Sequence, residues 1–122
     1  MISKNALIKL AKKYGMEYSS TSDGFYIQFP KKYSMVDDDY NFLDREITHK
    51  NQVQVKIMRT IDFVYENYSG KIGFLVTDKD NVNTLEEVED TLKNILTFME
   101  VTSTVTKQLQ SKLKENKLAK DF

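Results

Sequence analysis

The sequence predicts an α+β fold, built as a single domain over residues 1–122 with the element order α-β-β-α-β-α. Three observations lead to this prediction. Near both ends of the chain, apolar residues recur every three or four positions, which is the spacing of helices that pack on a core. Alternating apolar residues flank Asp23-Gly24, a dipeptide typical of tight hairpin turns. The chain holds only one proline and four glycines, so few residues interrupt regular structure. We therefore expect a small antiparallel, hairpin-based sheet packed on helices, with a long helix at the C-terminal end.

The first helix is expected over residues 3–14. Leu7 and Leu10 lie one turn apart on the same face, and lysines occupy much of the rest of the surface. Ser3 is a typical N-cap residue, and Gly15 is a typical helix terminator.

A β-hairpin is expected next. A two-residue turn at Asp23-Gly24, with the positive φ that such turns demand, pairs Ser22 with Phe25 and closes at Pro30, which cannot donate to a strand ladder. In this register one face of the hairpin carries the large apolar side chains of Tyr18, Phe25, Ile27 and Phe29.

The middle of the chain has weaker patterns. Residues 31–47 show no sustained period and are expected to form a long loop, with at most one helical turn over 41–46. In residues 51–68 a strand-like alternation competes with a helical spacing that persists over more residues, and this length favours a helix. The residues at helical spacing are Val53, Ile57, Ile61, Val64 and Tyr68.

An interior strand and a long helix are expected in the last part of the chain. Residues 71–77 are nearly all apolar, which is typical of a strand covered on both faces. Residues 85–118 have heptad spacing, although the β-branched cluster over 101–106 favours a kink or a break. The seam consists of Leu85, Val88, Leu92, Ile95, Met99, Thr102, Thr106, Leu109 and Leu113.

The stretch from Asp78 to Glu89 has two interpretations. Its acids match the first, third and last positions of an EF-hand loop, but Val82 and Asn83 stand where a ligand and a glycine are needed. A turn over 78–81 followed by an N-cap at Thr84 explains all of these residues, so we expect no metal site here.

Composition excludes several kinds of chemistry. The chain has no cysteine and a single histidine, His49, so it lacks the parts of thiol catalysis, zinc–thiolate sites and histidine-based triads. No glycine-rich phosphate loop is present either. The 18 acidic residues leave a carboxylate-pair mechanism open. We expect a protein that is not an enzyme and that uses no cofactor.

Hydropathy predicts a cytoplasmic protein. The longest apolar run near the start is Ala6–Ile8, too short for a signal-peptide core, and nothing approaches the roughly 18 apolar residues of a membrane span.

An acidic segment with interleaved aromatic residues is the best candidate for binding a protein partner, because aromatic residues dominate the energetics of many interfaces. Its residues are Asp37, Asp38, Asp39, Tyr40 and Phe42.

The C-terminal helix suggests an antiparallel homodimer. Residues 78–100 hold seven acids and two lysines, whereas residues 101–122 hold five lysines and two acids, so two antiparallel copies pair opposite charges. The candidate interface residues are Leu92, Ile95, Met99, Thr102, Thr106 and Leu109. The alternative is that this helix packs on its own sheet.

These observations favour a small, non-enzymatic protein-interaction module. Its size and its lysine-rich, asparagine-rich composition fit a phage or mobile-element accessory protein that inhibits a host defence protein by covering its surface. The alternative is a protein that binds nucleic acid non-specifically, through Lys31, Lys32, Tyr33 and the lysines of the tail.

Overall fold

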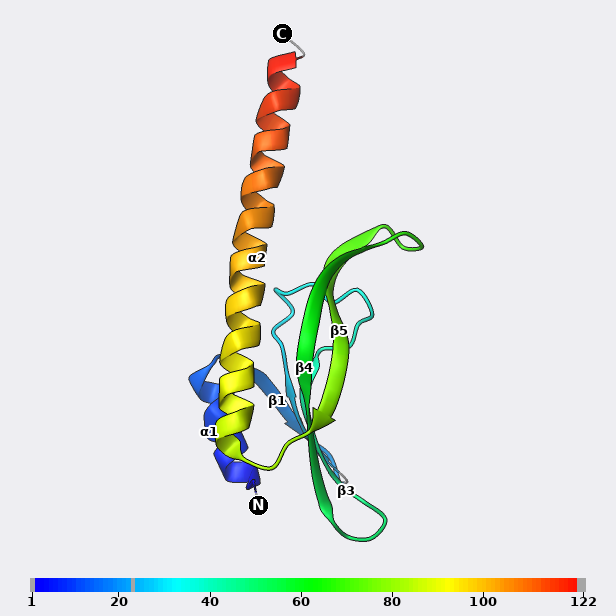
Figure 1. Cartoon of the computed structure of the whole chain (residues 1–122), viewed down its shortest axis with the longest axis vertical. Coiled ribbons are helices and arrows are strands. Elements are labelled where there is room, and N and C mark those ends of the chain that lie inside the picture. The colour runs from blue at the N-terminus through cyan, green and yellow to red at the C-terminus, as the bar shows by residue number, and fades with distance from the viewer. Residues whose placement is uncertain (1, 23, 121–122) are drawn as a thin grey trace.

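The computed structural model describes residues 2–22 and 24–120, and for residues 113–120 it gives only the course of the backbone. Five antiparallel strands form one sheet in the order β1-β2-β3-β4-β5 within the described chain, and a helix stands at each end of the sequence (Figure 1). The α+β class is thereby confirmed. The elements are α1 (Lys4–Lys13), β1 (Glu17–Ser20), β2 (Gly24–Gln28), β3 (Asn41–Ile47), β4 (Val53–Glu66), β5 (Lys71–Asn81) and α2 (Leu85–Lys120).

Helix α1 begins and ends where the sequence predicts. The Ser3 hydroxyl accepts a hydrogen bond from the backbone N–H of Ala6 at 3.2 Å, and Gly15 follows the helix with a φ of +67°. Leu7 and Leu10 are buried in the core. The N-cap and the left-handed glycine together fix the length of this helix.

The β1–β2 hairpin forms, but its predicted register is wrong by two residues. Ser20, and not Ser22, pairs with Phe25. A shift of two preserves the faces of a strand, so Phe25 and Ile27 are buried as expected. Gly24 does not adopt a positive φ and is the first residue of β2, and Asp23 lies outside the described residues.

The loop predicted over residues 31–47 is wrong in its second half, because residues 41–47 form strand β3. A run of charged residues concealed the apolar pattern of this strand in the sequence. Asp44, Arg45 and Glu46 follow one another, yet Leu43 is fully buried and pairs with Ile57 in the centre of the sheet. The Arg45 side chain reaches the backbone carbonyl of Ile2 (3.4 Å), so its charge sits at the margin of the core.

The helix predicted over residues 51–68 is also wrong: this segment is the 14-residue strand β4. The helical spacing was accidental, and the competing alternation was the correct signal. Arg59 interrupts that alternation, because its guanidinium lies where an apolar side chain is expected. There it donates to the Asn81 carbonyl (2.8 Å) and pairs with Glu87 of α2 (2.7 Å).

Strand β5 differs from its prediction in two ways. It is an edge strand and not an interior one, and it extends through Asn81, so the turn expected over 78–81 is wrong. The helix start after it is correct, since the Thr84 hydroxyl accepts from the Glu87 N–H at 3.2 Å. Helix α2 then runs without a break through residues 101–106, where a kink or break was expected.

The core lies between one face of the sheet and the two helices, which stand on the same side of the strands (Figure 1). Its members come from both helices and from the central strands. Among those with no exposed side-chain surface are Leu7, Ile27, Leu43, Ile57, Val88, Leu92 and Met99.

Candidate interaction surface

The acidic and aromatic segment predicted to bind a partner belongs to a long connection between β2 and β3, here named the strap (residues 29–40). On the helix side of the sheet, the Tyr33 ring packs edge-on against Phe29 and Phe74. Ser34 and Val36 then hydrogen-bond to the backbone of Phe74 in β5 (2.7 and 3.0 Å). The strap therefore pairs with the outer edge of β5.

Beyond this edge the strap reaches the opposite face of the sheet. Asp39 forms an ion pair with Lys79 (2.8 Å), and Asp38 lies 3.8 Å from Lys71. Both lysines alternate with Phe74 along β5, so they project away from the helices. Close passage of the strap requires a glycine in β5, because a Cβ on Gly73 would lie 2.4 Å from the Ser34 carbonyl oxygen.

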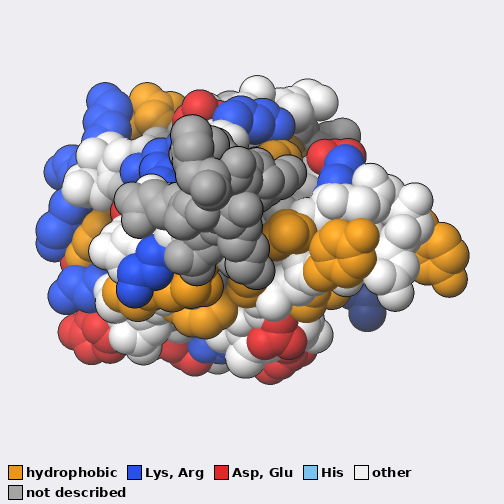
Figure 2. All heavy atoms as spheres, turned by 90° about the horizontal axis from the view of Figure 1, so that it is seen from above, with side chains coloured by type: hydrophobic (Ala, Val, Ile, Leu, Met, Phe, Trp, Pro, Cys, Tyr) orange, Lys and Arg blue, Asp and Glu red, His pale blue; other side chains and the backbone are white. Residues whose placement is uncertain are grey.

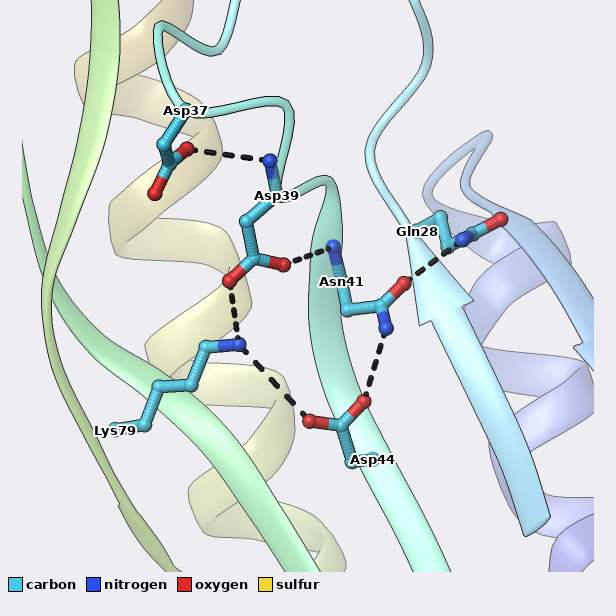
Figure 3. Close-up of polar contacts among 6 residues, drawn as sticks. All are labelled: Gln28, Asp37, Asp39, Asn41, Asp44 and Lys79. Atoms are coloured by element: carbon cyan, nitrogen blue, oxygen red, sulfur yellow. Dashed lines mark hydrogen bonds and ion pairs between the residues drawn. The ribbon is translucent and has the colours of Figure 1, made fainter.

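Most of the predicted partner-binding residues make contacts within their own chain, and Figure 3 shows those of Asp37 and Asp39. Asp37 accepts a hydrogen bond from the Asp39 N–H, and Asp39 in turn accepts one from the Asn41 N–H. The Tyr40 ring lies beneath the Lys31 ammonium, and Phe42 is buried in the core. Of these five residues, only Asp37 and Asp38 are exposed, whereas Asp39 and Tyr40 are half-buried.

Lys79 holds two carboxylates together in the same network (Figure 3). It lies 2.8 Å from Asp39 and 4.0 Å from Asp44. Burial raises the pKa of Asp44, and the Lys79 charge opposes that effect. The arrangement is one cation between two acids, which suits fastening the strap to the sheet.

The predicted dimer seam divides into two parts. Leu92, Ile95 and Met99 are buried in the core of their own chain, so they are not accessible to a second copy. Packing of the helix on its own sheet, the stated alternative, therefore accounts for the first half of the seam. Thr102 and Thr106 are partly exposed, Leu109 is exposed, and the Leu113 side chain lies outside those described.

A second row of α2, which shares Leu109 with the predicted seam, is apolar and exposed. Phe98, Val101, Val105 and Leu109, here named the α2 stripe, have 39%, 58%, 47% and 56% of their surface exposed. Their spacing of three and four places them along one side of the helix. The apolar residues of this stripe are visible in the sequence. The neighbouring heptad seam is more regular, so the dimer interface was predicted on the seam.

The second exposed apolar surface lies on the outer half of the β4–β5 hairpin, here named the arm (residues 61–76). Phe63 pairs with Phe74, and Tyr65 pairs with Ile72, so these side chains share the face on which Phe74 meets Phe98 of α2. Tyr68, in the turn at the tip, is completely exposed. The arm patch consists of Phe63, Tyr65, Tyr68 and Ile72.

A cleft of about 320 Å³ separates the arm from α2. Phe63, Ile72 and Phe74 supply an apolar wall on the arm side, whereas Ser103, Thr106 and Gln110 supply a polar wall on the helix side. Seen from above, hydrophobic side chains are exposed on the part of the molecule that projects to the right, where the tip of the arm lies (Figure 2). Sequence reasoning missed the arm because it assigned β4 to a helix.

Some of the lysines proposed to contact nucleic acid already contact side chains of their own chain. Lys32 pairs with Glu100 (3.0 Å), and Lys31 covers Tyr40. Lys13 of α1 likewise pairs with Glu89 (2.8 Å). Lys107 and Lys112 of the tail are exposed.

No cluster of three or more His, Asp or Glu side chains suited to a metal ion occurs in the described part of the chain. Asp78 and Asp80 of the EF-hand-like stretch lie on β5, and His49 lies exposed in the turn between β3 and β4. Among the described helices, none combines the length and apolar character needed to cross a membrane.

Comparison of the chain with protein-family models, with curated proteins and with solved structures finds no match.

Proposed function

We propose that the chain is a non-enzymatic protein-interaction module that binds a partner protein through the arm patch. The observation that supports this most strongly is the arm itself. A hairpin that projects from the core with four exposed aromatic and aliphatic side chains carries a cost in water, unless another protein covers them.

The composition of the arm patch suits an interface more than a catalytic cleft. Two of its four residues are tyrosines, which provide a large contact area at low entropic cost and are enriched among residues that dominate binding energy. Tyr65 and Tyr68 are 60% and 100% exposed, so both are available to a partner. Inhibition of a host protein by covering its surface is one role that such a module can fill.

Paired variants test this function. Tagged chain is used to purify binding partners from the native host, and the affinity of the purified pair is then measured by calorimetry. We expect Tyr68→Ala to weaken binding at least about tenfold, which corresponds to about 1.4 kcal/mol. Tyr18→Ala is the matched control, because Tyr18 is an exposed tyrosine of β1, outside the arm.

Two results would contradict the proposal. One is an affinity for the purified partner that no arm-patch substitution changes, Tyr68→Ala included. The other is tight, steeply salt-dependent binding to single-stranded nucleic acid in a gel-shift titration, which would favour the lysine-based alternative.

A further inference from the structure

We infer that the cleft between the arm and α2 receives the Tyr68 side chain of a second copy of this chain, and that the two copies exchange these side chains symmetrically. The inference rests on the proposed function, since it names the protein that the arm binds. The tip of each arm lies at the cleft of the other copy, so one dimer contains two identical contacts.

The size of the cleft restricts what can occupy it. Its volume is about 320 Å³. A helix with its side chains is roughly 10–12 Å in diameter, so even one turn of a helix exceeds this volume. Pockets at the lower end of the usual range, roughly 300 Å³, enclose small molecules, and a single aromatic side chain belongs to that size class. One large side chain, and not a whole helix or strand, therefore fits inside.

The two walls of the cleft suit the two parts of a tyrosine. The wall on the arm is apolar, and an aromatic ring packs favourably edge-on or offset against Phe63 and Phe74. The wall on α2 carries hydroxyl and amide groups, and a buried phenol needs such a partner. The Thr106 hydroxyl donates to the Thr102 carbonyl (2.8 Å), so its oxygen can still accept a hydrogen bond from a phenol.

Tyr68 is the side chain of this protein that is best placed to fill the cleft. It lies in the turn at the tip of the arm and is completely exposed, so it does not occupy the cleft of its own copy. The arm diverges from α2 toward its tip, which carries Tyr68 away from that cleft (Figure 1). The tip is therefore available to the cleft of another molecule.

A two-fold axis beside the middle of the arm allows both exchanges at once. Phe63 lies two residues before Tyr65 on the same face, and Tyr65 pairs with Ile72. Placing the axis between Tyr65 and Glu66, with the two arms antiparallel and face to face, sets Tyr68 of the second copy level with Phe63. Tyr65 and Ile72 of both copies then lie nearest the axis, so the whole arm patch is covered.

One pair of opposite charges fits the same arrangement. Glu66 is the last residue of β4 before the tip, and Lys107 stands at the cleft. Among the side chains that the structure describes, neither Glu66 nor Lys107 belongs to an ion pair, whereas Lys32 and Glu100 at the cleft pair with each other (3.0 Å). The tip therefore brings an acid to the cation that is left at the cleft, which favours this partner and this orientation.

Sedimentation equilibrium of the full chain tests the inference. We expect a dimer at micromolar concentrations. Tyr68→Ala empties both clefts and Ile72→Glu places a charge in both, so each should raise the dimer dissociation constant on the order of 100-fold, about tenfold for each contact. Ile47→Glu is the control, since Ile47 is 52% exposed, close to the 50% of Ile72, but lies on β3 outside the arm.

A blocked cleft separates the role of the cleft from that of the arm. Ser103→Phe fills the cleft from the wall on α2 and leaves the arm unchanged, and it should also raise the dissociation constant on the order of 100-fold. Gln108→Phe is the matched control, because Gln108 is an exposed residue of α2 that does not line the cleft. Far-UV circular dichroism verifies that each variant is folded.

Mixing two variants tests whether the tip of one copy enters the cleft of the other. A Tyr68→Ala chain keeps an open cleft, and a Ser103→Phe chain keeps its tip, so a mixed dimer retains one of the two contacts. Its dissociation constant should lie about tenfold below that of either variant alone. Energy transfer between differently labelled chains measures this recovery.

Three results would overturn the inference: a monomer at 100-fold higher concentration, a dimer that Ser103→Phe leaves intact, or a mixture that associates no more tightly than the separate variants. The proposed function fails by a different result, namely partner binding that ignores the arm patch. A monomeric chain whose partner still depends on Tyr68 would remove the second copy and leave the function standing.

Discussion

Two glutamates of α2 each receive hydrogen bonds from an adjacent lysine–tyrosine pair on another element. Lys13 and Tyr14 donate to Glu89 (2.8 and 2.6 Å), which connects α1 to α2. Lys32 and Tyr33 donate to Glu100, which connects the strap to α2. Both glutamates are therefore bonded in their charged form.

These bonds predict how stability depends on pH. Hydrogen bonds from Lys13 and Tyr14 hold the pKa of Glu89 below its ordinary value of 4.5, and bonds from Tyr33 and Lys32 do the same to the pKa of Glu100. A lowered pKa in the folded state stabilises the fold above the unfolded value, and this contribution is lost as pH falls through the folded value. We expect the urea midpoint to fall with acidification below about pH 4.5.

A double variant isolates this effect. Glu89→Gln with Glu100→Gln should lower the urea midpoint at pH 7 and should make its decline in acid shallower. Glu17→Gln, a change at an exposed carboxyl of β1, should leave both unchanged. Parallel pH profiles for the double variant and the original chain would show that the two glutamates contribute nothing.

The strap is the element whose attachment the structure explains most fully. Lys79 fastens it on the face away from the helices, and the Phe74 backbone fastens it at the edge of β5. Lys79→Gln should lower the free energy of unfolding by about 1 kcal/mol at pH 7, the usual scale for a partly exposed ion pair. The loss should shrink as pH falls through the pKa of Asp44, since a protonated carboxyl no longer needs the lysine.

Amide hydrogen exchange locates this loss. In Lys79→Gln the N–H groups of Phe74 and Val36 should exchange faster, because they bond across the junction of strap and strand. The N–H of Met16, which bonds to Ala11 at the end of α1, is the control. Equal acceleration at all three amides would mean that the variant loosens the whole fold and not the strap.

At the same scale, the sequence predicted elements well where local signals agreed and poorly where distant contacts decided. The cap at Ser3 and the apolar face of α1 lie within one segment, and both were correct. Arg59 and Asp44 were misleading, because their partners, Glu87 and Lys79, are distant in sequence. In the sequence, a charged residue whose ion-pair partner lies on another element cannot be distinguished from one that is exposed to solvent.

The candidate site was predicted less well for the same reason. The acids at 37–39 have the composition of a contact surface, but Asp39 is committed to Lys79, and Phe42 to the core. The arm patch became visible only after β4 and β5 were known to pair, since cross-strand neighbours such as Tyr65 and Ile72 are seven residues apart in sequence. The α2 stripe required knowledge of which side of the helix the sheet covers.

For the whole molecule, covering of the arm and the outer half of α2 by a second copy would make the free energy of unfolding depend on protein concentration. If the outer half of α2 and the arm are covered by a second copy, unfolding also separates the two chains, and mass action then favours the folded dimer at higher concentration. A 100-fold increase in concentration adds about 2.7 kcal/mol per dimer to the free energy of unfolding. The thermal midpoint should therefore rise by several degrees between 1 and 100 µM, given roughly 4 °C per kcal/mol for a domain of this size.

Ile72→Glu decides whether this rise comes from the cleft. Without dimerisation the variant should melt at one temperature across the same range of concentrations, near the midpoint of the most dilute original chain, because its own core is untouched. Ile47→Glu should retain the full concentration dependence. A thermal midpoint of the original chain that does not change with concentration would mean that no second copy covers the arm and α2. Their exposed apolar residues would then be the binding surface for a different protein.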